Sequence, residues 1–597
     1  MNSPNVLFDA ARSALVAGDA KGAAQLAESL LVVAPGQPQA LHLLAVAERR
    51  NGRLSRARDL FASALMADPG NPEICNNYAN LLDEMGRPDL ARDLYGQAVA
   101  RAPSYDDAYV NLAVICRKLG AVTEGLAAAR RATELSPSSA RAWLILGQLR
   151  EEAGDGGGAS VALQRAVQIA PRDPRVLAAI AALKLRRGEV ATPAFDRALA
   201  VTPDEPDLAL GRAASLHAVG DTSAAKAALV ELVSAAPGFV AAHEMMAKLH
   251  IAEGDAGSAS ESFKAALAAR PHDEALWFAF LQTLSKLGGH EELQRAAGDA
   301  RRELGDRPAL IGFSALAADE LGEHDRAAAM LAGLDQAAEA GEQSDAFAVL
   351  LVRNQLRTGR FREAATRAEA ATARGARALL PYLATAWRLL GDDRWGDLEG
   401  NPGFIAVVDS APAAALVGDL IPVLRRLHTD RAPPLGQTIR RGSQTQGALF
   451  LRTEPIIAAL ADALMAAVKA YVAQLPEPRS GHPLLGGART GLRYCGSWSV
   501  RLSQGAFHVN HVHPDGWIGS AFYVVVPPAG GGDEARAGWL TLGEPPAELG
   551  LGLAPFRMVE PRPGRLALFP AYTWHGTRPF IEGERLTVAF DVVRDAT

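Results

Sequence analysis

The sequence predicts an α+β multidomain protein, with an α-solenoid of helix hairpins at residues 1–400 and a jelly-roll β domain with leading helices at residues 401–597. Three observations predict this division. Glycine and proline recur with one period through the first two thirds of the chain. After about Pro476, short β-branched and aromatic runs alternate with Gly/Pro-rich connections. Three of the thirteen histidines fall within six residues of one another in this second part, which is hard to explain by packing alone.

Glycine marks a repeat of 34 residues in the N-terminal part. The glycines at this interval are Gly18, Gly52, Gly86, Gly120, Gly154 and Gly188, and prolines keep the same step at Pro35, Pro69, Pro103, Pro137 and Pro171. Between these marks lie amphipathic stretches such as AYVNLAVICRKLG, with apolar residues three and four apart. Each unit is therefore expected to be a helix hairpin, in which glycine allows the tight turn after the first helix and proline ends the second.

The repeat resembles the tetratricopeptide repeat, and the stretch NYANLLDEMG that ends at Gly86 is among the better matches to the first helix of that family. The resemblance implies a right-handed superhelix whose concave face binds a protein or peptide. A spacer or a dimerisation arm is the alternative for such a fold. After Gly322 the spacing changes to 37 and then 32 residues, so the last hairpins are expected to be irregular and to pack against the next domain.

Composition argues against nucleic-acid and membrane functions. Charged residues make up 21% of the chain, and the net charge of −6 shows no basic excess. The N-terminus lacks a basic start, and no run of about 18 apolar residues is apparent, so we expect a soluble, cytoplasmic protein. The cysteines, Cys75, Cys116 and Cys495, form no CxxC pair and are expected to be buried thiols rather than a disulfide framework or a zinc ribbon.

The C-terminal part begins with helices and continues as strands. Helices are expected at Leu416–Leu427 and Ile456–Leu475, and strands at Trp498–Leu502, Ser520–Val526, Arg565–Phe569 and Leu586–Val593. This pattern suits an antiparallel jelly roll. In the last strand, one face carries Arg585, Thr587, Ala589 and Asp591 and can line a cavity, while the apolar residues between them are expected to pack against helices.

Histidines provide the chemistry of this domain. Residues two apart in a strand share a face, so His511 and His513 can direct both imidazoles at one point. His575 and, ten residues later, Arg585 follow in a second segment. Imidazole suits iron, zinc, copper or nickel, and three protein ligands leave positions open for substrate and oxygen. The pattern indicates a metal site with an anion anchor.

Five motifs resemble the iron(II)- and 2-oxoglutarate-dependent oxygenases, in the bacterial branch that joins tetratricopeptide repeats to a C-terminal oxygenase domain. They are RRGSQTQG, GSWSVRL, HVHPDGWIGSAFYVVVP, GRLALFPAYTWHGTRPF and ERLTVAFDV. The resemblance implies a double-stranded β-helix (jelly roll) that binds Fe(II) and 2-oxoglutarate and couples hydroxylation by O₂ to oxidative decarboxylation. It implies that His575 is the distal iron ligand, that Arg585 binds the distal carboxylate of 2-oxoglutarate, and that Tyr523 and Thr587 assist it. No catalytic residue beyond these ligands is expected.

The proximal metal ligands have two interpretations. His511 and His513 complete a three-histidine site, whereas His513 and Asp515 complete the two-histidine, one-carboxylate triad that is usual in the family. We favour His511 and His513, because the proline between His513 and Asp515 restricts strand geometry. His508 is three residues before His511, so it is expected on the opposite face of the strand.

These observations predict an oxygenase whose solenoid docks a protein or peptide, although a small metabolite or a carrier-bound intermediate fits the same residues. The alternative is a catalytically inactive repeat scaffold with a degenerate metal-binding jelly roll, suggested by the departure from the His-x-Asp pattern. A metal hydrolase is disfavoured, because no candidate general base lies near the histidines in the sequence.

Overall fold

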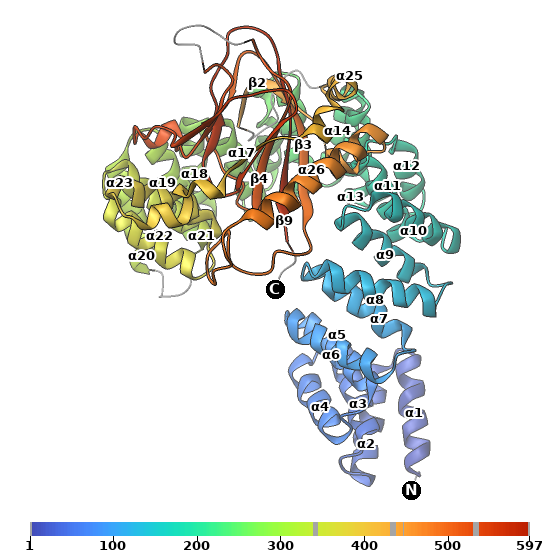
Figure 1. Ribbon diagram of the computed structural model, residues 1–597. Helices are drawn as coiled ribbons and strands as arrows, with labels where there is room; N and C mark the ends of the chain where they lie inside the picture. Colours follow the sequence, from blue (N-terminus) through green and yellow to red (C-terminus); the bar gives the residue numbers. More distant parts are fainter. Residues whose placement is uncertain (1–2, 338–343, 430–437, 446, 529–535, 595–597) are drawn as a thin grey trace. The chain divides into compact units, whose positions relative to one another are not determined.

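The computed structural model describes residues 3–337, 344–429, 438–445, 447–528 and 536–594 (Figure 1). By their contacts these residues form two compact units, residues 1–180 and residues 181–595. One residue of the RRGSQTQG motif, Gln446, lies outside the described residues.

The first unit consists of helix hairpins. Its helices are α1 (Pro4–Val16), α2 (Ala20–Val33), α3 (Pro38–Arg50), α4 (Leu54–Ala67), α5 (Pro72–Glu84), α6 (Pro88–Arg101), α7 (Asp106–Lys118), α8 (Val122–Leu135), α9 (Ala140–Glu152) and α10 (Gly156–Ile169), followed by the start of α11 (Pro174–Arg186). Gly86 follows α5 with φ of 74°, a left-handed conformation that glycine adopts without strain. Pro103 follows α6, as predicted. Ala57 and Ala91 are fully buried and allow close contact between helices.

The second unit continues the hairpins. Its helices are α12 (Thr192–Leu199), α13 (Pro206–Ala218), α14 (Thr222–Ala235), α15 (Val240–Ala252), α16 (Glu261–Ala269), α17 (Glu274–Leu287), α18 (His290–Leu304), α19 (Pro308–Glu320), α20 (His324–Ala337), α21 (Asp345–Arg357), α22 (Phe361–Ala373) and α23 (Leu380–Leu390). Leu383 and Trp387 of α23 share one hydrophobic core with Tyr572 and Leu566 of the β domain. The expectation that the last hairpins pack against the next domain is therefore confirmed.

Two antiparallel sheets form the β domain. The strands are β1 (Ala406–Asp409), β2 (Ile439–Gln444), β3 (Arg493–His508), β4 (Ile518–Val525), β5 (Leu540–Leu542), β6 (Arg557–Val559), β7 (Arg565–Pro570), β8 (His575–Thr577) and β9 (Arg585–Val593). The larger sheet has the order β1-β7-β4-β9-β3-β2 and the smaller sheet the order β6-β5-β8. An α-solenoid followed by an antiparallel β domain confirms the predicted fold class.

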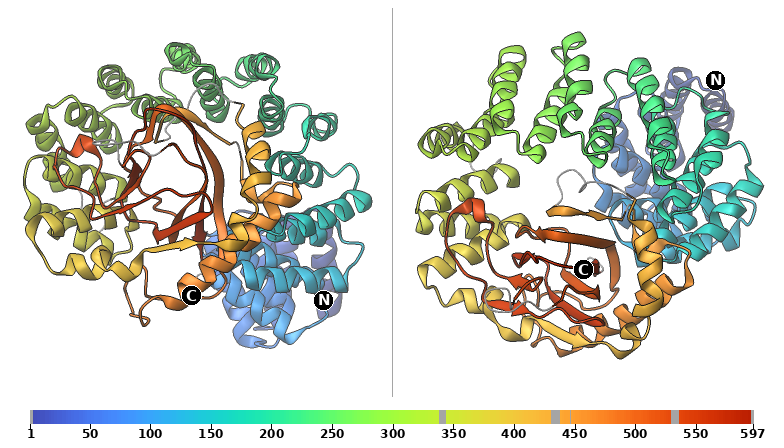
Figure 2. Two further views of the ribbon diagram at one scale, coloured as in Figure 1. Left: turned by 45° about the horizontal axis from the view of Figure 1, so that its top comes forward. Right: turned by 90° about the horizontal axis from the view of Figure 1, so that it is seen from above.

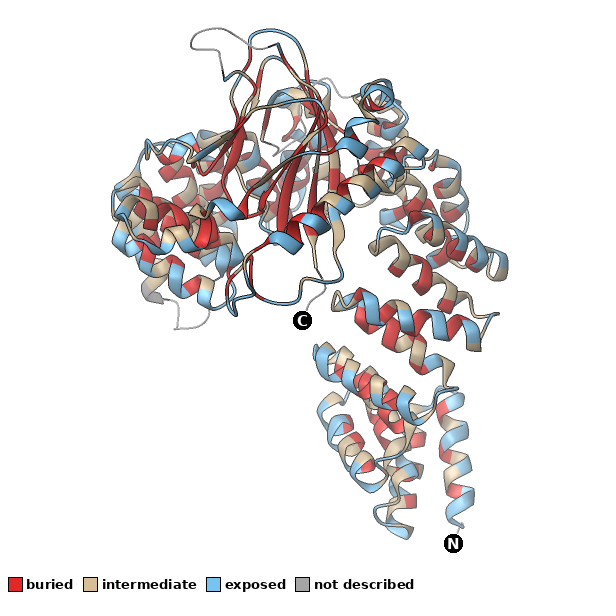
Figure 3. Ribbon diagram, viewed as in Figure 1, coloured by how far each residue is buried: buried red, intermediate tan, exposed pale blue. Residues whose placement is uncertain are grey.

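Helices α25 (Val417–Leu427) and α26 (Pro455–Gln474) correspond to the two predicted leading helices. Leu460 and Leu464 of α26 lie in the same core as Val588 and Phe590 of β9, so the apolar face of the last strand packs against a helix as predicted (Figure 3). Burying a side chain of this size stabilises the fold by about 1.5–3 kcal/mol.

Helix α26 has a mean hydropathy of 1.8 and meets the length and composition test for a membrane-crossing helix. Asp462 and Lys469 interrupt its apolar run, and its residues Leu460 and Leu464 lie in the core shared with the β domain. One expectation from the sequence is corrected. Cys495 is exposed rather than buried, because it lies at a bulge of β3 where the register with β9 shifts between Tyr494 and Gly496.

The predicted domain boundary between residues 400 and 401 stays a prediction. It falls between a π-helical turn, η3 (Gly396–Gly400), and strand β1. Side chains reach across it, since the hydroxyl of Tyr572 donates to the carbonyl oxygen of Leu398 over 2.7 Å.

Candidate metal centre

Backbone pairing brings the two histidine segments together. His511 lies just beyond β3 and forms an isolated antiparallel bridge with His575, the first residue of β8. Each of the two residues donates its backbone N–H to the carbonyl oxygen of the other over 2.9 Å. Opposite residues in such a pair project their side chains to the same side. Two residues on, the N–H of His513 donates to the carbonyl oxygen of Ala571, which directs the third ring to the same point.

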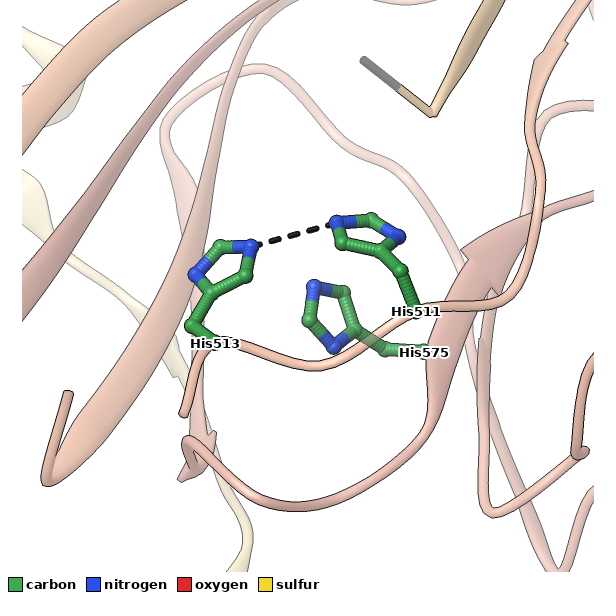
Figure 4. A group of neighbouring side chains, drawn as sticks. All are labelled: His511, His513 and His575. Atoms are coloured by element: carbon green, nitrogen blue, oxygen red, sulfur yellow. Dashed lines mark hydrogen bonds between the residues drawn. The ribbon is translucent and has the colours of Figure 1, made fainter. Parts of the chain in front are cut away.

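The three imidazoles converge (Figure 4). Ligand atoms of His511, His513 and His575 all lie within 4.8 Å of one another, and Nε2 of His511 lies 3.1 Å from Nε2 of His513. The ring centroid of His575 is 4.2 Å from that of His511 and 4.8 Å from that of His513. For comparison, nitrogen ligands about 2.1 Å from a metal ion and at right angles to each other lie about 3 Å apart.

An oxygen atom accepts a hydrogen bond from the outer nitrogen of each ring. Nδ1–H of His511 donates to the carbonyl oxygen of Val509 over 2.9 Å, and Nδ1–H of His575 donates to that of Thr573 over 3.0 Å. Nδ1–H of His513 donates to the carboxylate of Asp591 over 2.6 Å. Because these oxygens only accept, the tautomer is set and every Nε2 presents its lone pair to the others.

Facing lone pairs indicate a cation. Two acceptor nitrogens at 3.1 Å are stable only with a proton or a metal ion between them. Burial, together with the adjacent His513, lowers the pKa of His511 to about 3. Burial likewise holds the pKa of His575 well below its usual value. His511 and His575 therefore favour the neutral form, and a group of imidazole nitrogens is a donor set that fits a divalent transition metal.

Asp515 lies apart from the three converging rings. Within the described residues, the group that could hold a metal ion contains His511, His513 and His575, and Asp515 is an exposed residue outside it. Ligand roles themselves stay predictions. His508 was expected on the opposite face, but its ring stacks beside that of His511 with centroids 5.7 Å apart. The reason is that β3 ends at His508, so strand alternation does not continue to His511.

Arg585 lies in the interior without an anionic partner. It is 2% exposed, and among the described residues burial and Tyr523, not a carboxylate, act on its charge. Its Nε and the hydroxyl of Tyr523 have no hydrogen-bond partner among the described residues. The guanidinium carbon lies 5.2 Å from the ring centroid of Tyr523. Burial lowers the pKa of Arg585, and the proximity of Tyr523 opposes that effect.

A buried cation with unused donors fits a carboxylate ligand, because an unpaired charge in the interior is costly. Burial raises the pKa of the Tyr523 phenol, so that it is a neutral hydrogen-bond donor at neutral pH. Thr587, also predicted, is buried on the same face of β9 as Arg585. Burial lowers the pKa of His508, and the charges of His511 and Arg585 lower it too. The anion anchor therefore lies close enough to the histidine cluster to act on it electrostatically.

Sequence reasoning missed two residues of the site. Asp591 holds the outer nitrogen of His513, and Thr438 places its hydroxyl oxygen 3.1 Å from Nδ1 of His508 and 3.5 Å from Nε2 of His511. The signal for Asp591 was its place on the cavity face of β9 with Arg585. Thr438 lies two residues before the RRGSQTQG motif, and nothing in its local sequence marks it.

Solved structures match the helical repeats at low identity. PilF from Pseudomonas aeruginosa is 18% identical with a TM-score of 0.32, and the match covers 35% of this chain and 96% of that chain. A tetratricopeptide repeat protein from Parabacteroides merdae is 18% identical with a TM-score of 0.30, covering 47% and 97%. The protein TTC0263 from Thermus thermophilus is 26% identical with a TM-score of 0.26, covering 30% and 98%. Scores of this size carry no argument about function. No curated protein matches the chain.

Family comparisons cover both parts of the chain. Residues 8–72, 48–113, 106–139 and 123–174 match families described as "Tetratricopeptide repeat". Residues 496–591 match a family described as "Putative 2OG-Fe(II) oxygenase". The matched segment contains all three histidines, Arg585 and Asp591. The chain thus combines tetratricopeptide repeats in its N-terminal region with a domain similar to 2-oxoglutarate- and iron(II)-dependent oxygenases at residues 496–591, as the motifs predicted.

Proposed function

We propose that this protein is an iron(II)- and 2-oxoglutarate-dependent oxygenase that hydroxylates a substrate docked by its repeats. One observation carries the proposal: three imidazoles present facing lone pairs in a domain that also buries an arginine with no anion beside it. The two features together match what a metal ion and a dicarboxylate require. A degenerate scaffold would have no reason to retain both.

Each part of the proposed site has its own residues. His511, His513 and His575 hold Fe(II) through Nε2, and Asp591 orients His513. Arg585 binds a carboxylate of 2-oxoglutarate, with the Tyr523 hydroxyl as a second donor and Thr587 beside it. When bound, iron and 2-oxoglutarate supply the oxidising chemistry, in which O₂ gives one oxygen atom to a substrate C–H bond and the other to succinate as CO₂ is released.

The protein's own contribution is binding, orientation and the exclusion of water. His511 and His575 favour the neutral form, so they can bind a divalent cation without first losing a proton. Burial of Arg585 and Tyr523 strengthens their interaction with a carboxylate, because water does not compete there. No side chain has to act as a nucleophile or general base. The docked substrate is a protein or peptide, since repeat arrays offer a long surface for such ligands.

Anaerobic titration of the purified protein with Fe(II) and 2-oxoglutarate tests the proposal. We expect a weak visible metal-to-ligand charge-transfer band that is lost in His575→Ala and weakened in Arg585→Ala. His272→Ala and Arg562→Ala replace exposed residues of the same types and should leave the band unchanged. Absence of the band in the wild-type protein would instead support the inactive scaffold.

A further inference from the structure

We infer that helix α23 and the turn before it are a positioning element of the metal centre, in which Arg377, Thr385 and Arg388 hold the segments that carry the metal ligands. The inference rests on the proposed function for the identity of those ligands. Figure 2 shows the yellow helices α22 and α23 beside the red strands of the β domain. Three separate contacts between this element and the β domain carry the inference.

The first contact holds His575 through its neighbour. The indole N–H of Trp574 donates to the hydroxyl oxygen of Thr385 over 3.0 Å and to the carbonyl oxygen of Pro381 over 3.2 Å. The ring of Tyr382 lies edge-on to Trp574, with centroids 5.3 Å apart. Trp574 is 4% exposed, so its N–H has no access to water as an alternative partner. Helix α23 thereby fixes the position of Trp574 and, with it, the backbone that leads into His575.

The second contact holds the strand paired with His575. Arg388 donates from Nη1 to the carbonyl oxygen of Gly543 over 2.7 Å and from Nη2 to that of Ala554 over 2.6 Å. Gly543 in turn donates its N–H to the carbonyl oxygen of Trp574 over 2.7 Å. The preceding residue, Leu542, lies directly opposite His575 in the β5–β8 pair. One guanidinium therefore closes the segment between residues 543 and 554 at its base.

Aromatic rings keep that guanidinium in place. Its central carbon lies 5.5 Å from the ring centroid of Trp395 and 5.9 Å from that of Phe556. The two rings contact each other edge to face at 5.5 Å. A planar cation between aromatic faces loses little further freedom when it donates two fixed hydrogen bonds.

The third contact reaches the other ligand segment. Nη2 of Arg377 donates to the carbonyl oxygen of Gly516 over 3.0 Å. The N–H of Gly516 donates to the carbonyl oxygen of His513 over 3.1 Å, which closes the turn that follows this ligand. Arg377 lies in η2 (Arg377–Leu379), immediately before α23.

The three contacts come from one short stretch of the repeat region and reach both segments that carry histidines. Partners outside the ligands that orient a metal site typically change metal affinity about 10–100-fold when they are removed. Helix α23 and the turn before it are therefore needed to hold the three Nε2 atoms at the distance that a metal ion requires. The repeat region thus supports the metal centre in addition to its proposed role as a docking surface.

Co(II) binding to the full chain tests the inference. Arg377→Met, Arg388→Met and Thr385→Val should each weaken Co(II) affinity, measured by the visible absorption of the bound ion, by about 10-fold. Arg394→Met is the matched control, because the side-chain interactions of Arg394 with described residues are those with Asp392, Glu369 and Trp387, all within the hairpin region. Its Co(II) affinity should stay within about 2-fold of wild type, the size of change expected when no partner of the site is lost.

The outcomes separate this inference from the proposed function. If the wild-type chain binds no Co(II), the proposed function fails. If it binds Co(II) and the three variants match Arg394→Met, only the positioning role fails. Circular dichroism checks that each variant is folded. Should the methionine variants unfold, Thr385→Val and Arg388→Lys decide the question, since the first exchanges one hydroxyl for a methyl and the second keeps the charge but not the two-pronged donor.

Discussion

Each of the three histidines has a different environment behind it. Carbonyl oxygens accept from His511 and His575, whereas a carboxylate accepts from His513. A carboxylate behind an imidazole increases its basicity and its strength as a metal ligand. His513 is therefore expected to be the strongest of the three donors, and Asp591 is the residue on which that strength depends.

Asp591→Ala tests this dependence. Removing the carboxylate frees the ring of His513 and should weaken Co(II) or Fe(II) affinity by about 10-fold. Asp515→Ala is its counterpart, because Asp515 is exposed and lies outside the group of three rings. With three histidine ligands, Asp515→Ala keeps wild-type affinity. A large loss in Asp515→Ala, measured by metal titration, would restore the two-histidine, one-carboxylate interpretation.

Element η3 carries a buried carboxyl group. Glu399 is 3% exposed, its Oε2 accepts from the indole N–H of Trp395 over 3.2 Å, and its Oε1 has no hydrogen-bond partner among the described residues. Burial raises the pKa of Glu399 from 4.5 to about 7, against weaker opposing effects of Trp395 and Arg388. Because the folded state keeps this proton more tightly than the unfolded state, stability falls as pH rises from 4.5 to 7 and then stays lower.

Glu399→Gln should remove that pH dependence. Glutamine cannot ionise, so the variant should unfold at a higher temperature than wild type at pH 8 and close to wild type at pH 5. One pKa unit corresponds to about 1.4 kcal/mol, so the shift from 4.5 to about 7 puts the upper limit of the difference at about 3–4 kcal/mol. Thermal unfolding at both pH values measures it, with Glu582→Gln on the surface as control. Equal shifts at pH 5 and pH 8 would contradict ionisation as the cause.

Glycines in the helix hairpins have two different roles. Gly86 turns the chain after α5 with φ of 74°, whereas Gly96 lies inside α6 and an added methyl group there would meet no atom within 4 Å. Gly86→Ala should destabilise the array by about 1 kcal/mol, because an L-residue is strained at that angle. Gly96→Ala should stabilise it by about 0.5–1 kcal/mol through reduced entropy of the unfolded chain. Thermal or urea unfolding compares the two; opposite signs are the expected result.

The local sequence predicted those elements in which glycine or apolar residues recur at a fixed interval. The 34-residue step identified the hairpins, and alternation along residues 586–592 identified which face of β9 packs against helix α26. The predicted strand face of His508 was wrong, because β3 ends there. The predicted burial of Cys495 was wrong, because a bulge interrupts β3. Asp591 and the α23 contacts could not be derived, since residues 513 and 591, or 385 and 574, meet only in the folded chain.

For the whole molecule, the two compact units lead to separate expectations. The proposed metal and cofactor residues all lie in residues 181–595. A ligand at 100 times its Kd stabilises the structure that binds it by about 2.7 kcal/mol. Fe(II) with 2-oxoglutarate under anaerobic conditions should therefore slow hydrogen exchange in the β domain and in α22–α23.

The same experiment carries its own control. Peptides from α1 to α9 should exchange at unchanged rates, because that unit contains none of the proposed ligands. Mass spectrometry after proteolysis resolves the two regions. Protection in the β domain without protection in α22–α23 would contradict a mechanical connection between hairpin and metal centre.

Arg388 also bears on where the chain can accept an insertion. Since its guanidinium fixes both ends of the segment between Gly543 and Ala554, the residues between them are tied at their base and form a closed loop. Lengthening such a loop costs little, about 0.6 kcal/mol for each doubling, because its ends are already held. Gly550 and Gly552 are exposed within it and have no neighbouring atom within 4 Å of an added methyl group. We therefore expect a short reporter peptide inserted between Gly550 and Gly552 to leave the histidines in position, with the contact between the Glu548 carbonyl oxygen and Arg357 of the repeats retained.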